Sequence, residues 1–222
     1  MAADSWGLVY HNLLGRNLFI EAVLLLGGVK GSSITRHAIA GSPVGLIAFG
    51  GTGLNFAPPV LLHDGHAISQ TNTAVRYAAD KVGLTPAGVA GYQADAIMAQ
   101  VQDLAADSMK SASLDKPAES AAYFAGRFQK HLQFFDAYLE ASGSPFFFGL
   151  TRPSSADVVV WCAIHFFLRV QLSGSRYDEF ITARWPKLAR FEAAMEGLAE
   201  VQAAVAAISE GGRPLWAKPL IA

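Results

Sequence analysis

Several residue types are scarce in this chain of 222 residues, and each scarcity excludes a class of function. The one cysteine, Cys162, cannot form a disulfide within the chain, which is typical of a reducing compartment such as the cytoplasm. It lies in the apolar run VVVWCAIHFF, where a cysteine usually packs as a small hydrophobic residue rather than acting as a nucleophile. The six histidines are scattered and neither a CxxC nor an HExxH spacing occurs, so we expect no metal site.

Charge is scarce as well. Only 16% of the residues are charged and the formal net charge is −1, without a basic stripe, so we expect no binding to nucleic acid. The apolar run Leu18–Val29 contains Glu21 and is too short to span a bilayer, which predicts a buried helix and no membrane association. With 52% hydrophobic residues, the chain can build a sizeable core and still bury surface in a subunit contact.

The clearest local pattern is a hairpin that leads into a helix. Two runs suited to strands, Val60–His63 and His66–Ser69, flank Asp64-Gly65, a dipeptide that favours a type I′ turn because both residues take a positive φ. Pro58-Pro59 precedes the first strand, where proline marks a sheet edge, an entrance or a cis bond. Gln70-Thr71-Asn72 then opens an amphipathic helix, whose unpaired N–H groups form a ready anion site.

The remaining pattern divides the chain in two. Before the hairpin we expect a strand, a helix, a weak strand and a charge-poor loop: Gly7–His11, Leu18–Leu26, Ser33–Ile39 and Gly41–Ala57. After it we expect helices only: Ala94–Ala112, Glu119–Ser142, Ser154–Val170, Trp185–Met195 and Leu198–Ser209. The sequence therefore predicts an α+β fold, with an N-terminal thioredoxin-like α/β domain (1–81), a linker (82–92) and an all-α helical domain (93–222).

These motifs resemble those of the glutathione transferases. The resemblance rests on Pro59, the Asp64-Gly65 hairpin, Gln70-Thr71-Asn72 and Arg76-Tyr77, and on two later helix starts, Ser154-Ser155-Ala156-Asp157, a capping-box pattern, and Pro186-Lys187-Leu188. It extends from about Leu8 to Ile208, nearly the whole chain. The resemblance implies a cis-proline at residue 59, glutathione as co-substrate, a small apolar electrophile as second substrate, and a homodimer.

Tyr10, at the end of the first expected strand and followed by Gly15-Arg16, resembles the catalytic residue of the tyrosine-type (sigma/mu-like) members. A phenol with a pKa of about 10 stays protonated and can donate a hydrogen bond to a thiolate whose thiol has a pKa of about 8.5. Such a bond is worth about 1.5–3 kcal/mol, which lowers the thiol pKa by about one to two units. The alternative is a tyrosine packed at a strand end. No Ser or Cys, the catalytic residues of other types, occurs in Val9–Lys30.

The same resemblance implies a glutathione-binding set: Arg16, Pro58, Gln70, Thr71 and Asp95. Gln70 and Thr71 would hold the γ-glutamyl carboxylate, and Asp95 would reach the γ-glutamyl ammonium of the partner subunit, although plain helix capping and an ordinary helical Asp stay open. Pro58 departs from the family because it lacks the N–H that binds the cysteinyl backbone. No Trp or Lys occurs in Gly41–Phe56 to bind the glycine carboxylate, so Arg36, His37 or Asn55 is a candidate for that role, and the sequence does not choose between them.

The electrophile site implied by the resemblance consists of His11, Leu14, Met98, Gln102 and Trp216, although a role in the core stays open for its apolar members. Phe56 resembles an interface phenylalanine of the mu class. We expect glutathione conjugation, with two alternatives: a sigma-like isomerase that uses glutathione, and a non-catalytic binding or structural protein with this fold.

Overall fold

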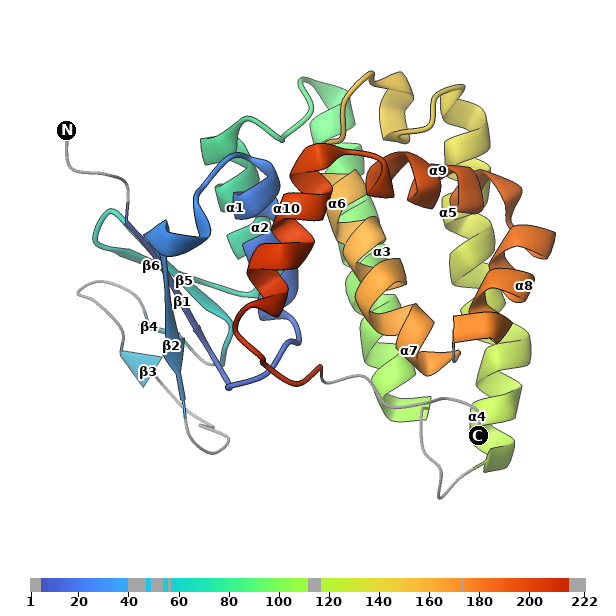
Figure 1. Cartoon of the computed structure of the whole chain (residues 1–222), viewed down its shortest axis with the longest axis horizontal. Helices are drawn as coiled ribbons and strands as arrows, with labels where there is room; N and C mark the ends of the chain where they lie inside the picture. The colour runs from blue at the N-terminus through green and yellow to red at the C-terminus, as the bar shows by residue number, and fades with distance from the viewer. Residues whose placement is uncertain are drawn as a thin grey trace. The chain divides into compact units, whose positions relative to one another are not determined.

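The computed structural model describes residues 5–39, 47–48, 54–55, 57–111, 117–172 and 174–215. The chain divides into two units (Figure 1), one comprising Met1–Thr85 and Ala199–Trp216 and the other Pro86–Leu198 and Ala217–Ala222. The first unit contains the sheet and the second is helical, so the predicted fold class is confirmed. None of the helices in the described part of the chain is long and apolar enough to cross a membrane.

The main sheet of the first unit has four strands in the order β2-β1-β5-β6. Strands β1 (Trp6–Tyr10) and β2 (Ile34–Ala38) run parallel, whereas β5 (Val60–His63) and β6 (His66–Ser69) are antiparallel to their neighbours. The predicted hairpin is confirmed, because Asp64 and Gly65 take φ values of 50° and 74° as a type I′ turn requires.

Three helices complete this unit: α1 (Asn17–Leu26), α2 (Thr71–Val82) and α10 (Ala199–Ser209). Helices α1 and α2 cover one face of the sheet, and α10 packs beside α1 (Figure 1). The ends of α1 and α2 approach closely at Gly27, where a Cβ atom would lie 2.2 Å from Cγ2 of Val82. Glycine is therefore needed there for packing, beyond its role as a helix stop.

The region between β2 and β5 differs from the prediction. It contains two short antiparallel strands, β3 (Ile47–Ala48) and β4 (Leu54–Asn55), where the sequence predicts a loop. Strands of two residues are too short to show the alternation of apolar and polar residues that identifies a strand in a sequence.

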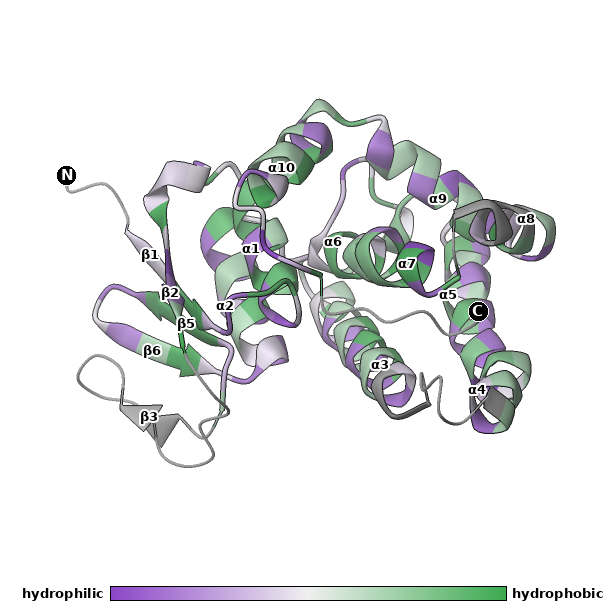
Figure 2. Ribbon diagram, turned by 60° about the horizontal axis from the view of Figure 1, so that its bottom comes forward, coloured by the Kyte–Doolittle hydropathy of each residue, from purple (hydrophilic) through white to green (hydrophobic). Residues whose placement is uncertain are grey.

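The second unit consists of helices α3 (Val89–Ser111), α4 (Pro117–Tyr123), α5 (Gln129–Ser142), α6 (Ser155–Cys162), α7 (Arg169–Gln171), α8 (Gly174–Arg184) and α9 (Pro186–Glu196). Helix α3 begins five residues before the predicted start, and α8 is absent from the prediction. Two predicted continuous helices are interrupted by π-helical turns, Phe124–Phe128 between α4 and α5 and Ala163–Leu168 between α6 and α7. Purple and green alternate along α3 and α5 in Figure 2, as expected for amphipathic helices.

Helix α6 is the centre of the second unit. Every residue of it is buried, and Trp161 is fully so. The predicted capping box is present at its start: the Asp157 carboxylate accepts the Ser154 backbone N–H (2.8 Å), the Ser154 hydroxyl (2.6 Å) and the Phe147 N–H (2.9 Å). Burial raises the pKa of Asp157 to about 6, against the opposing effect of these hydrogen bonds.

Candidate functional site

The strand register of the first unit brings the predicted glutathione-site residues to one edge of the sheet. Val9 pairs with Val60, and Val60 pairs with Ser69. Tyr10 follows Val9, Pro58-Pro59 precedes Val60 and Gln70 follows Ser69, so all three segments leave the sheet at the same end. Tyr10 and Pro59 are far apart in the chain but lie at adjacent strand ends, because antiparallel pairing aligns the end of β1 with the start of β5.

Tyr10 is half-buried at the end of β1, and the N–H of Arg16 lies 3.3 Å from its phenol oxygen in donor geometry. Burial raises the pKa of Tyr10, while the Arg16 N–H and the Arg16 charge act in the opposite direction. The phenol is therefore protonated at neutral pH. Its oxygen accepts one backbone hydrogen bond, and no described residue accepts from its own O–H, which can therefore donate to a ligand.

The loop after β1 fits closely around this phenol. A Cβ atom on Gly15 would lie 2.8 Å from the Tyr10 oxygen, so only glycine leaves room for the hydroxyl. The N–H of Gly15 donates to the side-chain oxygen of Asn17 (2.8 Å), which is 2% exposed and fixes the loop at the start of α1. Sequence analysis did not identify Asn17, since an asparagine at a helix start reads as an ordinary capping residue.

The prolines and the start of α2 lie at this same end of the sheet, next to β5 and β6. The Pro58–Pro59 bond is cis, as predicted, and Pro58 offers a carbonyl but no N–H. Gln70 has a φ of 67°, which is unusual for a residue other than glycine, and its side chain makes no capping hydrogen bond. Thr71, 6% exposed, is the first residue of α2. Strained backbone of this kind often occurs at binding sites.

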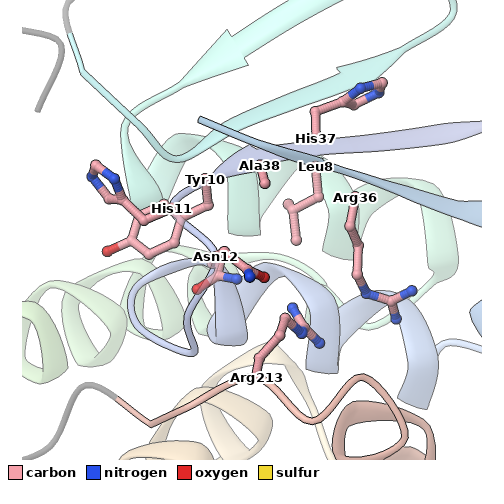
Figure 3. Close-up of a pocket in the computed structure, with 9 residues that line it drawn as sticks. Leu8, Tyr10, His11, Asn12, Arg36, His37, Ala38 and Arg213 are labelled. Carbon is pink, nitrogen blue, oxygen red and sulfur yellow. The ribbon is translucent and has the colours of Figure 1, made fainter. Parts of the chain in front are cut away.

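A small cavity of about 60 Å³ adjoins Tyr10 (Figure 3). Its wall includes His11, Arg36 and His37, and also Arg213 from the segment after α10. Arg36 and Arg213 both donate to the carboxylate of Glu21, which is fully buried. Sequence analysis named Arg36 and His37 but missed Arg213, because its partner Glu21 lies 192 positions away. The only sign of this ion pair in the sequence was Glu21, a charged residue inside the apolar run of α1.

The predicted electrophile residues of the first unit are in different environments. His11 is half-buried, with its ring edge-on to Tyr10 at a centroid distance of 5.2 Å. Leu14 is 6% exposed, its N–H donates to the carbonyl of Pro214 (2.8 Å), and it pairs with Leu215. Trp216 and Phe56 lie outside the described residues.

The predicted residues of the second unit lie on α3. Asp95 and Gln102 are half-buried, and Met98 is 1% exposed within the helical core.

The second unit also contains one cluster of residues of the kind that binds metal ions, His165, Glu192 and Glu196, the one such cluster found among the described residues. Arg169 donates to both carboxylates there, at 3.0 and 3.4 Å, so a guanidinium already neutralises charge that a cation would need.

Comparison with known proteins places the fold. Residues 95–194 match the family model of the glutathione S-transferase C-terminal domain. Similar solved structures include a Pi-class glutathione S-transferase of Onchocerca volvulus (TM-score 0.74, 18% identity, covering 95% of this chain and 97% of that one). A glutathione S-transferase of Caenorhabditis elegans gives a TM-score of 0.68 at 20% identity over 92% of this chain and 98% of that one.

The structure of prostaglandin synthase D of Nilaparvata lugens is also similar, with a TM-score of 0.68, 15% identity and coverage of 91% of this chain and 97% of that one. No curated protein sequence matches the chain. Identities this low show the fold alone. The chain thus has the glutathione transferase fold, and residues 95–194 of its helical unit match the model of that family's C-terminal domain.

Proposed function

We propose that this protein is a glutathione transferase of the tyrosine type (sigma/mu-like) that joins the glutathione thiolate to small apolar electrophiles. The observation that carries the proposal is the environment of Tyr10. Its phenol is half-buried and protonated, and its O–H is available at the edge of the sheet where Pro58 and the Gln70-Thr71 helix start also lie.

In this mechanism Tyr10 acts as a hydrogen-bond donor and not as a base. The raised pKa of Tyr10 keeps the proton on the phenol, so the O–H stabilises the thiolate after the thiol proton has left to solvent. The thiolate then attacks the electrophilic carbon. With an aryl halide, a carbon–sulfur bond forms, the carbon–halogen bond breaks and the halide leaves with the electron pair.

The remaining residues are proposed to bind glutathione. Gln70 and the N–H groups at the start of α2 suit the γ-glutamyl carboxylate, because a helix N-terminus carries a partial positive charge. The Pro58 carbonyl suits the cysteinyl N–H, and Arg16 places its charge beside Tyr10. Asp95 is the proposed contact for the γ-glutamyl ammonium of the partner in a homodimer. His11, edge-on to Tyr10, is proposed to contact the electrophile.

We propose a cytoplasmic location, which the single cysteine supports because the chain cannot form an internal disulfide. A non-catalytic binding role is the second candidate. The observation that favours it is Pro58, since the N–H missing from this residue removes one hydrogen bond to the tripeptide, worth about 0.5–1.5 kcal/mol.

The decisive experiment compares retention on immobilised glutathione with conjugation of a generic aryl halide, for the wild type and Tyr10→Phe. The phenylalanine keeps the ring and removes the hydroxyl, so the thiol pKa rises by about one unit or more and conjugation at pH 7 falls at least about tenfold. Tyr92→Phe, at a side chain that is 75% exposed on α3, is the matched control and should behave as wild type. Retention without conjugation in the wild type would favour the binding role, and an unchanged rate in Tyr10→Phe would exclude Tyr10 as the donor.

A further inference from the structure

The cavity beside Tyr10 has an unbalanced charge. The buried carboxylate of Glu21 accepts from Arg36 through Nη2 (2.6 Å) and Nε (3.0 Å), and from Arg213 through Nη1 (2.9 Å) and Nη2 (2.8 Å). Two guanidiniums therefore share one carboxylate, which leaves a net charge of about +1 because arginine stays protonated in proteins. No second carboxylate within the described part of the chain forms an ion pair with either arginine.

One donor of this arginine pair also lacks an acceptor. The Arg213 side chain is only 8% exposed, and its buried Nε has no hydrogen-bond partner among the described residues. Arg36 uses Nη1 on the Ile34 carbonyl at 3.3 Å and is 31% exposed, so part of its guanidinium faces the cavity. A buried, incompletely paired positive charge is destabilising unless an anion approaches it.

The rest of the wall suits an anion. The amide side chains of Asn12 and Asn17 contribute further polar groups, and none of the described residues that line the cavity is acidic. Figure 3 shows Arg36 and Arg213 extending toward each other from two separate segments, β2 and the stretch that follows α10. A volume of about 60 Å³ accommodates one small charged group rather than a whole organic molecule.

We propose that this cavity binds one carboxylate group of a ligand that also reaches the Tyr10 phenol, with Arg213 and Arg36 supplying the positive charge. The carboxylate belongs either to glutathione or to the second substrate, and only this identification rests on the proposed function. The anion site itself does not depend on catalysis. The anion site and the proposed transferase activity can therefore be disproved separately.

The first experiment measures thermal unfolding with increasing formate at constant ionic strength, with chloride as the balancing anion and no glutathione present. A ligand that binds only the folded state raises the unfolding temperature in a saturable way. We expect this in the wild type and its loss in Arg213→Gln, in which Glu21 and Arg36 remain as a neutral pair. Arg36→Gln leaves the equivalent neutral pair with Arg213 and serves as the second variant if Arg213→Gln does not fold.

Glu21→Gln should change the formate response in the opposite direction to the arginine variants. It leaves two guanidiniums without a carboxylate, so formate should raise its unfolding temperature more than that of the wild type. Arg190→Gln, at an exposed position on α9, is the matched control and should respond as the wild type does. An equal formate response in the wild type and both arginine variants, or no response in the wild type, overturns the proposal.

The second experiment identifies the molecule that carries the carboxylate. Calorimetry compares glutathione with its glycine monoethyl ester, and steady-state kinetics compares an aryl halide with its carboxylated analogue. In the wild type, we expect the charged compound of one pair to bind at least about tenfold better than the neutral compound of that pair. In Arg213→Gln, the two compounds of that pair should bind equally well. If neither pair differs in the wild type, the proposal is overturned. A carboxylate preference without any conjugation contradicts only the proposed transferase activity.

Discussion

At the scale of single residues, the properties of Tyr10 come from atoms that belong to other residues. Its oxygen accepts the Arg16 N–H, and the absence of a Cβ on Gly15 leaves the space that its hydroxyl occupies. The identity of Tyr10 is visible in the sequence, but this fit is not. A Gly-Arg pair five residues downstream predicts a loop and does not reveal that the loop contacts the phenol.

Gly15→Ala tests this fit. The added methyl group would lie 2.8 Å from the phenol oxygen and 3.0 Å from Cε1 of Tyr10, so the ring or the loop must move. A misplacement of about 1 Å at a reacting group can lower a rate by about 100-fold. We expect kcat/KM for aryl halide conjugation to fall at least tenfold while the far-ultraviolet circular dichroism stays that of the wild type.

Gly126→Ala is the control for that change. Gly126 lies in a π-helical turn of the second unit, and a Cβ atom there meets nothing within 4 Å. The control should keep the wild-type rate. A Gly15→Ala variant as active as the control would mean that the loop adapts without disturbing Tyr10.

At the scale of elements, the sequence predicted well those structures that local chemistry determines. The Asp64-Gly65 turn and the Ser154–Asp157 capping box are each specified by two or three adjacent side chains, and both are present. The π-helical turns and α8 were missed because no local residue pattern distinguishes them. They depend on packing between segments, such as the contact of Phe180 of α8 with Phe124 and Phe128 in the first π-helical turn.

The capping box also predicts how stability depends on pH. The pKa of Asp157 is raised from 3.8 to about 6, so between these values the folded state holds a proton that the unfolded state has lost. The contribution of this group is therefore fully present below pH 4 and is lost as the pH rises through about 6. At about 1.4 kcal/mol per pKa unit, the loss amounts to about 3 kcal/mol in the free energy of unfolding.

Denaturant unfolding at a series of pH values between 4 and 7 measures this effect as the difference in the free energy of unfolding between the wild type and Asp157→Asn. Asp157→Asn cannot titrate, so the stability of the wild type relative to this variant should decrease by about 3 kcal/mol across the range. Asp80→Asn, which removes an exposed carboxylate on α2, is the control for the loss of one carboxylate. A difference between wild type and Asp157→Asn that does not vary with pH would show that Asp157 titrates in its ordinary range.

At the scale of the whole molecule, the order of the chain and the division into units do not coincide. The chain leaves the first unit near residue 85 and returns to it at Ala199. Helix α10 then packs on α1, Arg213 pairs with Glu21, and Leu215 pairs with Leu14 in the loop after β1. Sequence analysis assigned residues 93–222 to a single helical domain. It could not foresee these contacts because each joins residues from opposite ends of the chain.

This arrangement predicts that a substitution near the end of the chain weakens the unit that contains Tyr10. Ile208 is fully buried on α10, and truncation of a buried isoleucine to alanine costs about 2–5 kcal/mol. In Ile208→Ala, hydrogen exchange should therefore show faster exchange of the amides of α1, which α10 contacts, than in the wild type. Glu200→Ala, on the exposed side of the same helix, should leave these amides as protected as in the wild type. If protection is lost in α10 but not in α1, the C-terminal helix does not stabilise the unit on which it packs, and the support of the Tyr10 loop must come from the sheet.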